Sequence, residues 1–60
     1  MALDYENFKD ENIILVYHEG NQIKSCEGKL KNFNDEFLEI IKNSKNILFN
    51  KKFVVSIAKQ

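Results

Sequence analysis

The sequence predicts a single small domain built mainly from antiparallel β-strands, with a short helix at its start. Sixty residues are enough for one domain and leave no length for a second. Several short runs are rich in β-branched and aromatic residues, which favour strands, and turn-forming residues separate them. We therefore expect one domain over residues 1–60, with a helix over 1–11 and a five-stranded sheet over 12–60.

The first segment, residues 1–11, has the composition of a short helix. Leu3 and Phe8 supply apolar side chains, and acidic residues gather near the start, where the helix macrodipole favours negative charge. A helix this short persists only when it packs against the rest of the protein. We expect it to end at Asn12.

The next two segments, residues 12–18 and 22–32, have the composition of strands. The first is nearly continuous in apolar character and rich in β-branched residues. Between them, Gly20-Asn21 is a turn signal, because both residues tolerate positive φ. These features predict an antiparallel hairpin.

The second of these strands contains a change in its apolar phase. Ile23 has an odd number, whereas Cys26 and Leu30 have even numbers, so one residue inserted near Ser25 would bring all three to one face. A β-bulge supplies such an insertion. Gly28, in the middle of the strand, predicts a sharp bend or a close approach of another backbone.

Residues 33–43 are ambiguous between helix and strand. As a helix, Asn34 would cap the start and four apolar side chains would share one face. Those side chains are Phe37, Leu38, Ile40 and Ile41. As a strand, the same residues would alternate between two faces. Local sequence slightly favours the helix, so an α+β fold with a helix at 35–43 stands as the alternative.

Residues 46–49 and 53–58 are the last two predicted strands, and Asn50-Lys51-Lys52 is the tight turn between them. Regular alternation in the last strand predicts one face made of Phe53, Val55 and Ile57, and an opposite face made of Val54, Ser56 and Ala58.

The chain has one cysteine, Cys26, and one histidine, His18. An internal disulfide and a zinc site built from cysteines or several histidines are therefore excluded. No third residue is visible to orient a thiol–imidazole pair, so we expect no catalytic residue, no metal, no cofactor and no small-molecule substrate. Small domains without such supports are often stabilised by oligomerisation, which makes a homo-oligomer the expected state.

The charges are distributed unevenly along the chain. Residues 1–19 have one lysine against five carboxylates and carry −4, whereas residues 20–60 carry +4. The positive charge of residues 20–60 permits an anionic partner. Every basic residue is lysine, however, whereas arginine is the residue that usually recognises nucleobases. The apolar run Ile13–Tyr17 is too short to span a bilayer, and the first residues include acids where a signal peptide has basic ones. We expect a cytoplasmic protein without a membrane partner.

The order of the predicted elements and one motif resemble the Sm-like family of RNA-binding rings, including its bacterial Hfq branch. The motif begins at Gly28 and extends to Ile41, and the structural positions of the family's first motif are filled by Gly28, Leu30, Phe33, Phe37, Ile40 and Ile41. The resemblance implies a strand rather than a helix over 33–43. It also implies a strongly bent, SH3-like small barrel that closes into a ring by edge-strand pairing between subunits.

The sequence departs from the family at the positions that contact RNA. Asn34 stands where the family has aspartate, Leu38 where it has a base-contacting asparagine, and Glu36 where it has a stacking platform. Lys51 and Lys52 lie near the place of the second motif without matching it.

The resemblance and the lysine positions together give six candidate RNA-binding residues. They are Asn34, Glu36, Lys51, Lys52, Lys29 and Lys31. The expected function is a subunit of a homo-oligomeric ring that binds single-stranded RNA weakly through lysine-rich surfaces. The alternative is a structural or protein-interaction oligomer without nucleic-acid binding.

Overall fold

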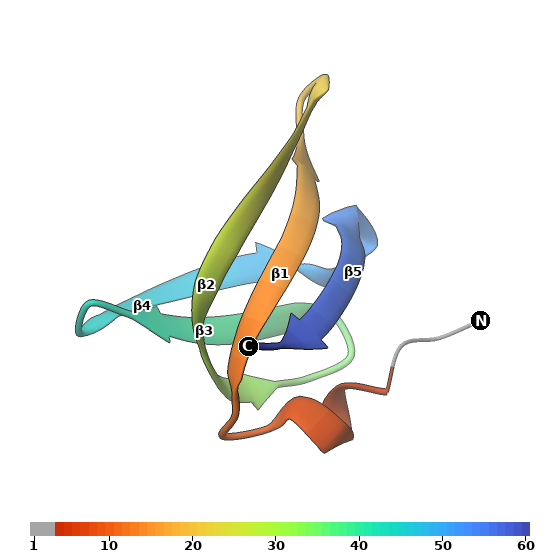
Figure 1. The fold of residues 1–60 in the computed structure, drawn as a ribbon. Helices are drawn as coiled ribbons and strands as arrows, with labels where there is room; N and C mark the ends of the chain where they lie inside the picture. Colours follow the sequence, from red (N-terminus) through yellow and green to blue (C-terminus); the bar gives the residue numbers. More distant parts are fainter. Residues whose placement is uncertain (1–3) are drawn as a thin grey trace.

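The computed structural model describes residues 4–60, which form a five-stranded antiparallel sheet with short 3-10 turns (Figure 1). The elements in chain order are η1 (Tyr5–Phe8), β1 (Asn12–Glu19), β2 (Gln22–Phe33), β3 (Phe37–Lys42), β4 (Lys45–Asn50), η2 (Lys51–Phe53) and β5 (Val54–Lys59). The order across the sheet is β4-β3-β2-β1-β5, so the sheet is open and has β4 and β5 as its edges. The prediction of a mainly β fold with five strands is confirmed.

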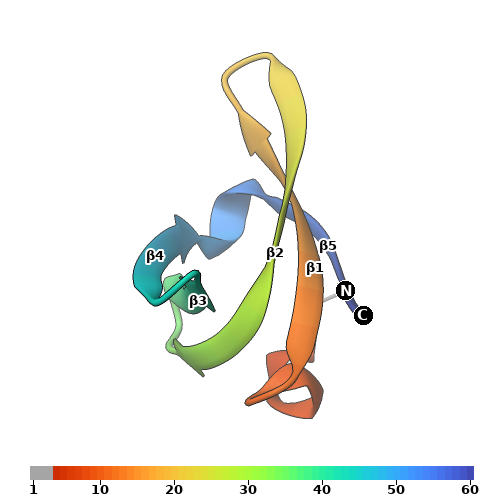
Figure 2. The same ribbon diagram turned by 60° about the vertical axis from the view of Figure 1, so that its left-hand side comes forward.

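Strand β2 has 12 residues and changes partner along its length. Its first part pairs with β1, from Glu19↔Gln22 to Asn12↔Lys29. Its last part pairs with β3, starting at Lys29↔Ile41. Figure 2 shows β2 curving between these two parts, so that β3 and β4 lie across one face of the β1–β2–β5 layer.

Gly28 lies next to the point where β2 changes partner. A Cβ atom there would be 2.6 Å from Ile40 Cγ2 and 2.6 Å from the carbonyl oxygen of Ile41. These distances are shorter than van der Waals contact, so only glycine lets β3 approach β2 this closely. The predicted close backbone approach at Gly28 is confirmed.

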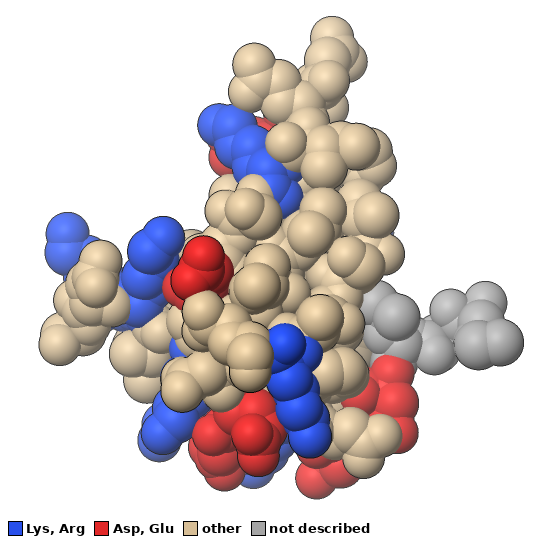
Figure 3. Space-filling model, viewed as in Figure 1, with Lys and Arg blue, Asp and Glu red and all other residues tan. Residues whose placement is uncertain are grey.

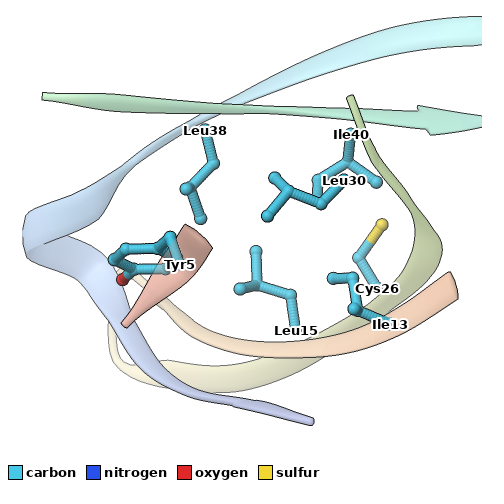
Figure 4. Close-up of a cluster of buried hydrophobic side chains, with 7 residues drawn as sticks. All are labelled: Tyr5, Ile13, Leu15, Cys26, Leu30, Leu38 and Ile40. Carbon is cyan, nitrogen blue, oxygen red and sulfur yellow. The ribbon is translucent and has the colours of Figure 1, made fainter. Parts of the chain in front are cut away.

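The bend brings side chains from four segments into one core (Figure 4). The buried residues are Tyr5, Ile13, Leu15, Cys26, Leu30, Leu38 and Ile40. Partly buried aromatic and aliphatic side chains extend this cluster. Among them are Tyr17 and Phe49, whose ring centroids are 4.7 Å apart. The core is therefore small and is built from the inward face of each central strand.

Two tight turns connect the hairpins. Gly20 has φ +61° and is followed by Asn21 between the paired residues Glu19 and Gln22, as the turn signal predicts. Asn43 and Ser44 have φ of 52° and 64° and join β3 to β4, with both residues in the conformation of a type I′ turn. Serine is not favoured at positive φ, so local sequence does not predict this second turn.

The predicted helix over 1–11 is wrong for the residues that the structure describes, and residues 1–3 lie outside them. Only the 3-10 turn Tyr5–Phe8 forms. The chain is extended at Lys9, and Asp10 has φ 63°. The Asp10 amide then donates to the Leu30 carbonyl oxygen (2.7 Å), and the Leu30 amide donates to the Glu11 carbonyl oxygen (3.1 Å). Pairing with β2 thus outweighs the weak tendency of a short segment to continue as a helix. In residues 4–60 we find no helix of the length and apolar character that crossing a membrane requires.

The β-bulge predicted near Ser25 is also wrong. Val16 pairs with Ser25 inside an unbroken β1–β2 register. Ile23 is 64% exposed, so it has no core phase to share with Cys26. The register of β2 against β3 instead shifts between Leu30 and Asn32, which leaves Lys31 as the extra residue.

A second register shift explains the faces of β5. Val16 pairs with Ser56 and Tyr17 pairs with Val54, so Val55 is the extra residue. Val54 and Ile57 both pack against the core, whereas Val55 is 46% exposed. The regular alternation predicted for residues 53–58 is therefore wrong at Val55.

The alternative helix at 35–43 is wrong, because Phe37–Lys42 forms strand β3. The apparent helix cap is a turn: Asn34 Oδ1 accepts hydrogen bonds from the amides of Glu36 and Phe37, each at 2.8 Å. The Asn34 amide also donates to the Phe37 carbonyl oxygen (3.0 Å), which begins the β2–β3 ladder rather than a helix. Leu38 and Ile40 then alternate into the core.

The close approach at Gly28 predicts that Gly28→Ala destabilises the fold by about 2–3 kcal/mol, because the methyl group overlaps backbone that cannot move away. Urea unfolding at a fixed protein concentration measures this loss. Gly20→Ala is the matched control: nothing lies within 4 Å of its Cβ position, and only its φ of +61° is strained. We expect about 1 kcal/mol for the control. Equal losses in the two variants would contradict this account of Gly28.

Candidate functional site

The turn between β2 and β3 holds two of the six candidate residues. Asn34 closes the turn with its side-chain oxygen, which is already shared by two backbone amides. Glu36 is exposed and extends its carboxylate into solvent. Asn34 therefore keeps only its side-chain NH₂ group for a ligand, and Glu36 adds negative charge beside it.

The 3-10 turn η2 holds Lys51 and Lys52 next to this turn. The Lys51 amide donates to the Glu36 carbonyl oxygen (2.8 Å), which joins η2 to the β2–β3 turn. Asn50 caps η2, because its Oδ1 accepts a hydrogen bond from the Lys52 amide (3.0 Å). The structure thus brings Asn34, Glu36 and Lys51 together from two turns that are far apart in the sequence.

The ammonium group of Lys51 lies against two aromatic rings. Lys51 Nζ is 4.6 Å from the ring centroid of Tyr5 and 5.2 Å from that of Phe33, and the two centroids are 6.1 Å apart. We call these three side chains the Lys51 corner. The quadrupole of an aromatic ring attracts a cation that lies within about 6 Å of the ring centroid. The ammonium of Lys51 is therefore already engaged by two rings of the protein itself.

Tyr5 is the buried member of the Lys51 corner, with 8% of its surface exposed. Burial raises the pKa of the Tyr5 phenol above its ordinary value. The folded protein holds this proton more tightly than the unfolded chain does. The contribution of Tyr5 to stability is therefore complete below about pH 10, the ordinary pKa, and is lost as pH rises through the folded pKa.

The other lysines among the candidates do not join the Lys51 corner. Lys52 is exposed, and its ammonium is 5.2 Å from the ring centroid of Phe53. Lys29 and Lys31 are exposed on β2, where Lys31 is the bulged residue. Figure 3 shows lysines separated by carboxylates over the visible face, with no continuous basic surface there. Sequence reasoning therefore grouped residues that the fold keeps apart.

Sequence reasoning also gave Tyr5 and Phe33 no role beside Lys51. Tyr5 is 46 positions before Lys51, and no spacing rule connects them. The available signal was a pair of aromatic residues, Tyr5 and Phe8, in residues 4–11, which are otherwise acids, an asparagine and a lysine. A three-dimensional contact was needed to find this group.

Cys26 and His18 do not form a reactive pair. They lie on neighbouring strands, but Cys26 pairs with Leu15 and His18 pairs with Ile23. Cys26 is buried, with its Sγ 3.8 Å from the Glu27 carbonyl oxygen, whereas His18 is exposed. Over residues 4–60, we also find no group of three or more His, Cys, Asp or Glu side chains that suits a metal ion.

An open groove of about 690 Å³ is lined by residues of β4 and of the β1–β2 hairpin. We call it the β4 groove. Its apolar lining comes from Tyr17, Cys26, Phe37, Ile47, Leu48, Phe49 and Phe53. His18, Glu19 and Lys42 lie at its polar rim. An apolar hollow beside a free strand edge is suited to contact with another polypeptide.

Comparison of the chain with protein families, with characterised proteins and with solved structures finds no match.

The Lys51 corner predicts that Lys51→Met lowers the free energy of unfolding by about 0.5–1 kcal/mol, because methionine keeps much of the packing and loses the cation. Urea unfolding of Lys51→Met, Tyr5→Leu and the double variant gives the coupling energy between the two residues. Lys29→Met is the control, since Lys29 is exposed on β2. Additive losses in the double variant would contradict a direct contact between Lys51 and Tyr5.

Proposed function

We propose that this chain is a subunit of a homo-oligomeric, Sm-like ring in which the β4 edge of one copy pairs with the β5 edge of the next. The observation that carries the proposal is the open sheet: within residues 4–60, β4 pairs only with β3, and β5 pairs only with β1. Each edge strand presents unpaired amide and carbonyl groups, which readily add another strand. Head-to-tail pairing between two different edges generates a ring when the rotation closes.

Both edges also expose apolar side chains. Leu48 on β4 is 66% exposed and Val55 on β5 is 46% exposed. The β4 groove adds Phe37 and Phe53 to the apolar surface beside Leu48. Burial of such side chains between copies stabilises an assembly at about 25 cal/mol per Å² of apolar surface removed from water.

The size of the core favours assembly as well. A chain of 60 residues buries only about 60% of the surface of its unfolded state, so its stability as a monomer is marginal. Cys26 is the single cysteine and is free, so no disulfide supports the fold. We place the ring in the reducing cytoplasm, where such a thiol stays unpaired.

RNA binding by this ring is weak and rests on lysine–phosphate attraction. The position of the family's base-contacting asparagine is filled by Leu38, which is fully buried and so does not reach a ligand. Glu36 repels phosphate, and the ammonium of Lys51 lies against two rings. Lys52, Lys29 and Lys31 remain free to attract a polyanion in the manner that weakens with salt.

The burial of Leu38 and the engagement of Lys51 also favour the second candidate, a structural oligomer that binds no nucleic acid. The two candidates share the same assembly. They differ only in whether the exposed lysines attract single-stranded RNA.

Edge pairing predicts that Leu48→Lys and Val55→Lys each break the ring, because a charge on an edge strand opposes addition of another strand. Native mass spectrometry of the wild type should give a closed oligomer, with five to seven subunits by analogy with the family. Each variant alone should be a monomer. Mixing the two should give a dimer, since Leu48→Lys keeps its β5 edge and Val55→Lys keeps its β4 edge.

The matched control is Ile23→Lys, which changes an exposed apolar residue on the β1–β2 hairpin away from both edges and should leave the ring intact. A dimer formed by Val55→Lys alone would indicate that two β4 edges pair with each other. A wild-type chain that is monomeric at micromolar concentration would overturn the ring.

The scattered lysines predict weak RNA binding that depends on salt rather than on base identity. Fluorescence anisotropy should show oligo(U) and oligo(A) binding alike at low salt and negligibly near physiological ionic strength. Lys51→Ala plus Lys52→Ala should reduce the low-salt binding, and Lys52→Ala alone should cause most of that reduction. Tight binding that selects one base and resists salt would contradict the weak-site account, and no binding at any salt would favour the structural oligomer.

A further inference from the structure

The N-terminal segment places an aromatic ring against a lysine and carries negative charge. Residues 4–8 contain the carboxylates of Asp4 and Glu6 and no basic residue, a net charge of −2. Tyr5, from this segment, lies against Lys51 with 4.6 Å between Nζ and the ring centroid. An acidic segment that presents an aromatic ring to a lysine shares two chemical features with a short piece of single-stranded RNA.

We propose that residues 4–8 are an autoinhibitory segment, in which Tyr5 occupies the position at the Lys51 corner where a nucleobase of single-stranded RNA binds. This inference rests on the RNA affinity in the proposed function and names how that affinity is regulated. When the segment detaches, Phe33 offers its ring face to a base, and the ammonium of Lys51 becomes free for the adjacent phosphate.

The geometry of the corner makes the two occupants mutually exclusive. The ring centroids of Tyr5 and Phe33 are 6.1 Å apart, and the rings are tilted by 41°. Lys51 Nζ lies 5.2 Å from the Phe33 centroid and is in contact with Tyr5 at the same time. A base stacked on Phe33, with its phosphate on Lys51, needs the volume that the Tyr5 ring fills.

The segment is attached in a way that permits local release. Among residues 4–60, two backbone hydrogen bonds join the N-terminal segment to β2. The Asp10 amide donates to the Leu30 carbonyl oxygen, and the Glu11 carbonyl oxygen accepts from the Leu30 amide. Residues 4–8 bond only within the segment or to Lys9 and Glu11, as in the Asn7–Asp4 side-chain bond of 2.9 Å. Burial of Tyr5, together with the partly buried Phe8, therefore holds η1 in place. Residues 4–8 can turn away about Lys9 while Asp10 and Glu11 stay paired with β2.

Release exchanges one set of contacts for another of the same kind. Opening exposes the buried Tyr5 ring and breaks its contact with Lys51. Binding of RNA replaces the Tyr5 ring with a base and places a phosphate at the ammonium of Lys51. The segment must open before RNA binds. The apparent affinity for RNA is therefore the affinity of the open form multiplied by the fraction of molecules that are open.

The test compares binding of a fluorescein-labelled ten-nucleotide oligo(U) at low salt to five proteins. They are the wild type, Tyr5→Ala, Tyr5→Phe, Phe8→Ala, and Tyr5→Ala combined with Lys51→Ala. We expect Tyr5→Ala to bind about tenfold more tightly than the wild type, the size of one base–aromatic contact. Tyr5→Phe keeps the ring and should match the wild type. Phe8→Ala destabilises the same segment without uncovering Lys51 directly and should gain less than Tyr5→Ala.

The combined variant should lose the gain, because the phosphate contact at Lys51 is absent. Binding by Tyr5→Ala that equals wild-type binding, or a gain that persists without Lys51, would overturn the proposal. Circular dichroism and urea unfolding establish that each variant is folded at the temperature used.

A second measurement uses the unmodified protein, so the proposal remains falsifiable if Tyr5→Ala fails to fold. Ring currents of Tyr5 and Phe33 shift the Lys51 Hε resonances, and a Tyr5–Lys51 nuclear Overhauser effect reports the closed corner. Saturation with oligo(U) at low salt should remove this Overhauser effect. Its persistence in the bound protein would overturn autoinhibition, while native mass spectrometry reports separately on whether the ring assembles.

Discussion

The close approach of β3 to β2 at Gly28 is the constraint on which the rest of the structure depends. A single strand, β2, must pair with β1 along its first part and with β3 along its last part. A side chain larger than hydrogen at Gly28 would collide with Ile40 and with the carbonyl oxygen of Ile41. Because the approach is allowed, the sheet can fold across itself and enclose a core without a helix to cover it.

The two register shifts complete what the bend begins. An extra residue at Lys31 lets both Leu30 and Phe33 face the core, although they are an odd number of positions apart. An extra residue at Val55 does the same for Val54 and Ile57. In both places the strand reverses the faces of its side chains where the curvature of the sheet requires it. Val55 is left outward and exposed on an edge strand.

The same arrangement builds the Lys51 corner. The turn before β3 and the turn before β5 meet because the Lys51 amide bonds to the Glu36 carbonyl oxygen. Tyr5 then closes the corner from the N-terminal segment and belongs to the core as well. Tyr5 therefore has two roles, since its aromatic ring completes the small core and also covers the ammonium of Lys51. An open sheet with so few buried side chains is only marginally stable.

The sequence by itself determined the strands, the Gly20 turn and the special role of Gly28, because alternation, β-branching and glycine act over a few residues. It also indicated, through the resemblance, that residues 33–43 contain a strand, although local propensity favoured a helix. The cap-like Asn34 serves a turn, and only pairing with β2 and β4 distinguishes the two uses.

The tertiary structure alone decided the positions of the bulges, the fate of the N-terminal segment and the partners of Lys51. The bulge expected near Ser25 rested on Ile23 being a core residue, and its exposure follows from where β3 and β5 stop pairing. Tyr5 meets Lys51 because η1 and η2 pack at the same corner of a folded sheet. Contacts between residues so distant in the chain depend on the whole path of the backbone, which no local pattern encodes.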